Sequence, residues 1–73
     1  MTLISKALTD AGMSQYRLAQ LCGVSASAIN RAANGEMNVS LKIAQRIEKN
    51  LPGITVRGIM AEQLERNLKR AAE

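Results

Sequence analysis

The 73 residues suffice for one domain with a small core, to which every helix must contribute apolar side chains. Although 47% of the residues are hydrophobic, they include a single tyrosine and no Phe or Trp, a composition that favours packed helices over a sheet. The formal net charge of +4 is compatible with a polyanionic partner but does not establish one.

The composition lacks the residues on which several functions depend. There is no histidine and one cysteine, so we expect no zinc site, no internal disulfide and no histidine general base. The six carboxylates form no evident catalytic pair. No apolar run reaches the length of a bilayer, and no basic segment with a long apolar stretch opens the chain. We expect a cytoplasmic protein that is not an enzyme and needs no cofactor, metal or small-molecule ligand.

A first helix is predicted between residues 2 and 11 by apolar residues at helical spacing. Gly12 follows at the position where a glycine commonly ends a helix. We expect this helix to pack against the following segment through Leu3, Ile4, Ala7, Leu8 and Ala11.

Residues 14–35 predict two short helices joined by a tight turn. Ser14 and Ser25 are suited to be N-caps, and each lies within a pair of apolar residues that can form a hydrophobic staple. The staple pairs are Met13 with Leu18 and Val24 with Ile29. Gly23 stands where the chain must leave the first helix in a left-handed conformation. Ala19 is small enough for the point where the two helices cross.

The second of these helices has a polar side and an apolar side. Its polar residues recur at i, i+3, i+4 and i+7 and form one stripe: Ser27, Asn30, Arg31 and Asn34. The apolar residues form a seam with the preceding helix: Leu18, Cys22, Val24, Ile29 and Ala32. We therefore expect Cys22 to be a core residue and not a reactive thiol.

A loop over residues 36–39 is followed by a third well-marked helix. Ser40 is its predicted N-cap, and the helix should run from Leu41 to about Asn50. Pro52 and Gly53 end it, because proline cannot continue a helix. Its apolar side is expected to consist of Leu41, Ile43, Ala44 and Ile47, with Leu51 just beyond.

The last predicted helix is long and covers residues 55–72, with Thr55 as its cap and Ile54 and Ile59 as a staple pair. Gly58 marks either a place of close packing or a later start of the helix. The apolar residues on one side are Val56, Ile59, Met60, Leu64, Leu68 and Ala71. We expect the first three to complete the core. Leu64 and Leu68 then either meet their equivalents in a second chain or fold back on the first helix.

Residues 14–35 resemble the helix-turn-helix of the lambda-type phage repressor and Cro family. The matching positions are the opening glutamine, the small crossing residue, the turn glycine, the buried branched residue and the closing pair: Gln15, Ala19, Gly23, Ile29 and Asn34-Gly35. The resemblance implies an all-α, lambda repressor-like bundle of about five helices, forming a single domain over residues 1–73. It also implies double-stranded DNA as a partner.

The resemblance assigns candidate DNA contacts to individual residues. Arg31 is suited to the acceptors of guanine and Asn30 to adenine, whereas a neighbouring alanine can meet a thymine methyl group. The candidate base-reading residues are Ala26, Ser27, Ala28, Asn30 and Arg31. The candidate phosphate contacts are Gln15, Arg17, Asn34, Asn38, Ser40 and Lys42. The chain departs from the family at Ala26 and Ser27, where phage repressors often carry long amides, and we expect no contacts from a basic N-terminal arm.

The leading hypothesis is a sequence-specific transcriptional regulator, a phage or prophage Cro-like repressor that occupies an operator as a homodimer through Leu64 and Leu68. One alternative is the DNA-binding antitoxin of a toxin–antitoxin pair, which shares the fold and adds a toxin-binding surface. Another is a helical protein-interaction module, whose partner contacts would lack the steep salt dependence of a DNA complex. A membrane role is disfavoured because Glu62, Glu65 and Glu73 dilute the positive charge of the last helix.

Overall fold

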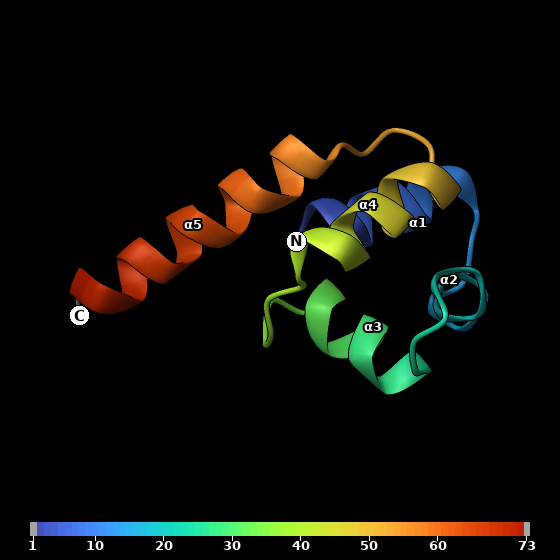
Figure 1. Ribbon diagram of the computed structural model, residues 1–73, viewed down its shortest axis with the longest axis horizontal. Helices are drawn as coiled ribbons and strands as arrows, with labels where there is room; N and C mark the ends of the chain where they lie inside the picture. The colour runs from blue at the N-terminus through green and yellow to red at the C-terminus, as the bar shows by residue number, and fades with distance from the viewer. Residues whose placement is uncertain (1, 73) are drawn as a thin grey trace.

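The computed structural model describes residues 2–72, and these form five helices without a strand (Figure 1). The helices are α1 (Leu3–Ala11), α2 (Gln15–Cys22), α3 (Ala26–Ala33), α4 (Leu41–Asn50) and α5 (Val56–Ala72). The helix α5 packs on α1 and α4 through its N-terminal part, and its C-terminal part projects from the bundle, to which polar side chains still connect it. The prediction of an all-α bundle of five helices is confirmed.

Hydroxyl groups set the starts of the helices as the sequence predicts. The side chains of Ser14, Ser25 and Ser40 each accept a hydrogen bond from the backbone N–H three residues later, at 3.0, 3.1 and 3.2 Å. Thr55 accepts in the same way from the N–H of Gly58 at 3.0 Å. Thr2, not predicted as a cap, does the same for α1. These caps satisfy N–H groups that have no partner within their own helix.

The turn between α2 and α3 is built on Gly23, which has φ 70° and ψ 31°. Its N–H donates to the carbonyl of Gln20, and the N–H of Val24 donates to that of Ala19. The carbonyl of Cys22 accepts a hydrogen bond from Arg46 Nη1 of α4 at 3.1 Å. A cation at a helix C-terminus also complements the helix dipole. The predicted left-handed turn is therefore confirmed, with a support from α4 that the sequence did not reveal.

Gly23→Val is expected to lower the free energy of unfolding by about 1–3 kcal/mol, because a β-branched residue is strained at positive φ. An added Cβ would itself find space, since its nearest neighbour would be Arg46 Nη1 at 3.8 Å. The strain should therefore arise from the backbone conformation and not from a clash. Thermal and urea unfolding would measure it, and an unchanged melting temperature would contradict this account of the turn.

The core is formed by apolar residues of all five helices and the loops between them. Its largest fully buried side chains are Leu18, Ile29, Ile47, Leu51, Ile59 and Cys22. Three residues of the apolar faces predicted for α1 and α4 are exposed and do not join the core: Leu3, Ala11 and Leu41. Leu41, the first residue of α4, is 57% exposed. The helix buries Ala44 and Ile47 instead.

The first half of α5 packs closely on α1. A Cβ at Gly58 would lie 3.3 Å from Leu3 Cδ1 and 3.1 Å from Thr55 Oγ1. Because α5 already begins at Val56, the alternative of a delayed start is wrong, and Gly58 marks close packing. Ile59 is buried, as expected for a residue that completes the core.

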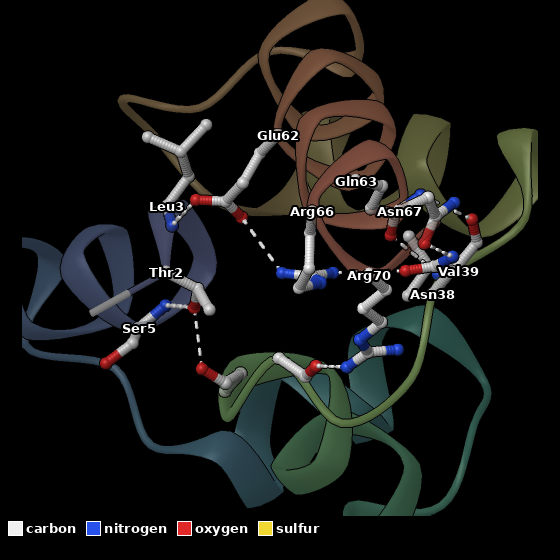
Figure 2. A network of polar contacts seen from close by, with 12 residues as sticks. Thr2, Leu3, Ser5, Asn38, Val39, Glu62, Gln63, Arg66, Asn67 and Arg70 are labelled. Atoms are coloured by element: carbon white, nitrogen blue, oxygen red, sulfur yellow. Dashed lines mark hydrogen bonds and ion pairs between the residues drawn. The ribbon is translucent and has the colours of Figure 1, made fainter. Parts of the chain in front are cut away.

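The second half of α5 presents its leucines to solvent. Leu64 is 60% exposed and Leu68 is 61% exposed, so neither folds back on α1. From Glu62 onward, the side chains of α5 that hydrogen-bond to the rest of the domain are those of Glu62, Gln63, Arg66, Asn67 and Arg70 (Figure 2). The usual arrangement of an amphipathic helix is thus reversed along this segment.

Candidate nucleic-acid interface

The outer face of α3 carries the polar stripe predicted from the sequence. Ser27, Asn30, Arg31 and Asn34 are all exposed. The opposite face is anchored in the core by Ile29, Ala32 and Ala33, which are at most 3% exposed. Ala26 and Ala28 lie at the edge of the stripe and are half-buried. A rigid helix therefore presents hydrogen-bonding side chains on one side, with small apolar groups beside them.

Three side-chain amides form a connected row across α2 and α3. Asn30 Nδ2 donates to Gln15 Oε1 at 2.9 Å, and Asn34 Nδ2 donates to Asn30 Oδ1 at 3.3 Å. These contacts fix the orientation of the Asn30 amide. One N–H and one lone pair of that amide remain, which is the set that an adenine edge requires. The row also joins Gln15, a candidate phosphate contact, to the candidate base-reading residues.

Arg31 differs from Asn30 and Asn34, which are hydrogen-bonded to other side chains of the protein. Within residues 2–72, its guanidinium takes part in no hydrogen bond or ion pair. Its five N–H donors are thus available to an external acceptor. The guanidinium geometry suits bidentate contacts with guanine or with a phosphate.

The candidate phosphate contacts lie at helix ends around the stripe. Gln15 and Arg17 are in the first turn of α2, Asn34 is the C-cap of α3, and Ser40 and Lys42 are at the start of α4. All except the half-buried Gln15 are exposed. Backbone amides at the starts of α2 and α4 would add their own attraction for anions.

Asn38 is the candidate phosphate contact whose side chain is bonded to α5. Its Nδ2 donates to Asn67 Oδ1 at 3.1 Å, and its Oδ1 accepts from Arg66 Nη2 at 3.1 Å. The side chain is therefore engaged with α5, which leaves one N–H of its amide for a phosphate.

Sequence reasoning missed two groups of residues that support this surface. Arg46 holds the carbonyl of Cys22 at the motif turn. Gln63 holds the backbone of Val39 in the loop before α4, and Arg70 Nη2 donates to the carbonyl of Gly35 at 3.1 Å. For Gln63 the sequence held a signal of burial but none of its partner, since Gln63 lies four residues after Ile59 and three after Met60, on the apolar side of the first turns of α5.

Residues 2–72 show neither a cluster of metal ligands nor a membrane-spanning helix. Among residues 2–72, no three His, Cys, Asp or Glu side chains gather where they could hold a metal ion. In the same range, no helix has the length and apolar character needed to cross a bilayer.

A family model described as helix-turn-helix matches residues 4–59, which include the whole motif and its flanking helices. The chain belongs to the lambda repressor/Cro-like helix-turn-helix family. It therefore carries a DNA-binding domain of the kind found in transcriptional regulators, a regulatory domain and not a catalytic one. No curated protein and no solved structure shows a significant match. Residues 60–72 of α5 lie beyond the part of this helix-turn-helix protein that the family model covers.

Proposed function

We propose that this helix-turn-helix protein is a sequence-specific repressor, of the phage or prophage Cro-like type, that acts in the cytoplasm by occupying a double-stranded DNA operator. The observation that carries the proposal is the α3 stripe, in which Arg31 is unengaged within residues 2–72 and Asn30 is held in a fixed orientation. In this mode of binding, α3 enters the major groove, where each base pair presents a distinct set of donors and acceptors.

Each candidate base-reading residue of α3 has a proposed role. Arg31 bonds to O6 and N7 of a guanine, and Asn30 bonds to N6 and N7 of an adenine. Ser27 tolerates several bases because a hydroxyl both donates and accepts. The methyl groups of Ala26 and Ala28 are suited to contact with thymine methyl groups.

The phosphate contacts fix the position of the domain on the duplex. Gln15 and Arg17 reach the backbone on one side of the groove. Asn34, Ser40 and Lys42 reach it on the other side. Asn38 contributes through its remaining N–H.

We further propose that two chains bind as a homodimer through α5. The support for this is the reversed polarity of the helix, which turns Leu64 and Leu68 to solvent while its polar residues contact the domain. Ala61 and Ala71 are also exposed and lie three residues before and after this pair, which gives the spacing of a helix–helix seam. A two-fold dimer places two α3 helices on half-sites about one helical turn apart.

Selection from a random DNA library tests the operator, with the full chain as bait. The expected result is a two-fold symmetric sequence with half-site centres roughly 10 base pairs apart. The logarithm of affinity should fall with the logarithm of salt concentration, with a slope of about −0.9 for each phosphate neutralised. A selected site placed over a promoter should lower transcription in a reporter strain. Binding without enrichment of any sequence would reject sequence-specific recognition, and no DNA binding would favour a protein-interaction module.

A further inference from the structure

The loop between α3 and α4 depends on α5 for its conformation. Gln63 is 8% exposed and bonds both polar groups of one loop residue: its Oε1 accepts from the N–H of Val39 at 2.7 Å, and its Nε2 donates to the carbonyl of Val39 at 3.1 Å (Figure 2). This is the pair of hydrogen bonds that a neighbouring strand would otherwise supply. One side chain of α5 thus takes the place of a β-partner.

Further residues of α5 bond to the loop at Asn38 and at Gly35. Asn67 and Arg66 bond to the two ends of the Asn38 amide. One turn further along α5, Arg70 bonds to the carbonyl of Gly35, where α3 ends. Within residues 2–72, no backbone-to-backbone hydrogen bond is made by residues 37–39. The polar side chains of α5 therefore supply the hydrogen bonds that the loop itself lacks.

The position of this loop matters for the DNA surface because of what it connects. It joins the C-terminal end of α3, with Asn34, to the start of α4, with Ser40 and Lys42. A hydrogen bond weakens steeply when its geometry changes, so a small displacement of a donor is enough to break its bond to a phosphate. Side chains that hold the loop would thereby control contacts that they do not make themselves.

We propose that Gln63, Asn67 and Arg70 are positioning residues for DNA binding, which hold the loop between α3 and α4 where its flanking groups meet the DNA backbone. The inference rests on the proposed DNA-binding function and deepens it. All three residues lie beyond the segment of residues 4–59 that the family model covers.

Two neutral substitutions test the proposal. Gln63→Met keeps the size of a buried side chain that cannot touch DNA, and removes both bonds to Val39. Asn67→Ala removes an exposed amide that bonds only to Asn38 within residues 2–72. The matched control is Gln20→Ala, which removes an exposed amide on α2. The measurements are operator affinity, its salt dependence, and amide hydrogen exchange at Val39, all below the melting temperature.

Asn67→Ala should weaken operator binding about threefold to tenfold, as expected when one hydrogen bond is removed, and speed exchange at Val39, whereas Gln20→Ala should change neither. Gln63→Met should have a larger effect and make the salt slope shallower by about 0.9 for each phosphate that the protein no longer neutralises. Asn67→Asp keeps the acceptor oxygen and should restore protection at Val39. Should Gln63→Met fail to fold, Asn67→Ala decides the question.

The outcomes separate this inference from the function on which it rests. If the wild-type chain binds DNA and the folded variants bind with unchanged affinity and salt slope, α5 has only a structural role and the proposal is overturned. If operator affinity falls while amide hydrogen exchange at Val39 stays slow, the substitutions do not weaken DNA binding by displacing the loop, and the proposal is overturned as well. A wild-type chain that binds no DNA overturns the proposed function and this inference together.

Discussion

Arg31→Ala is expected to weaken binding to the preferred operator by about 1–3 kcal/mol and to relax specificity at one base pair. The side chain is exposed on the outer face of α3, and within residues 2–72 it has no hydrogen-bond or ion-pair partner to lose. Folding should therefore be unaffected, and non-specific binding should stay nearly intact. Competition binding with operators varied at each position would locate the base pair.

Arg17→Ala is the matched control for this substitution, because it removes the same charge from an exposed position at the start of α2. As a phosphate contact, Arg17 should contribute nearly equally on every sequence, and its removal should make the salt slope shallower by about 1. If Arg31→Ala behaves in the same way, Arg31 contacts a phosphate and reads no base.

The double variant Leu64→Glu/Leu68→Glu is expected to keep its fold and lose its self-association. Both side chains are more than half exposed in the single chain, so charges there should cost the monomer little. In a dimer the same carboxylates would be buried opposite their equivalents, which is strongly unfavourable. Circular dichroism should show an intact helical protein, and sedimentation should show a monomer.

The effect of the double variant on DNA binding should depend on the number of half-sites. Affinity for an operator with two half-sites should fall markedly, because the second domain is no longer held at a high effective concentration. Affinity for a single half-site should change little. A folded variant with unchanged association would reject the α5 dimer.

The starts of the helices could be predicted from the sequence because their causes are local. The hydroxyls of Ser14, Ser25 and Ser40 bond to N–H groups three residues away, so the short sequence around each one contains both partners. The outer stripe of α3 followed from helical periodicity alone, since burial on one side requires exposure on the other.

The supports of the site could not be predicted because their partners are distant in the chain. Gln63 and Val39 are 24 residues apart, as are Arg46 and Cys22, and Asn30 and Gln15 are 15 apart. No periodicity relates such pairs, and a polar side chain bonds to whatever the packed helices bring to it. For Leu64 and Leu68 the sequence left two alternatives, and only the packing of α5 excludes folding back on α1.

The burial of Cys22 gives this protein a reporter group within its own motif. The side chain is 1% exposed at the end of α2. Burial raises the pKa of the Cys22 thiol above its ordinary value, although the Arg46 guanidinium opposes part of the rise. Since the thiolate is the reactive form, alkylation of the native chain must wait for the motif to open. The alkylation rate, followed by mass spectrometry, therefore measures the free energy of that opening. A bound operator should slow labelling in proportion to its occupancy, so one unmodified thiol would report DNA binding without an attached dye.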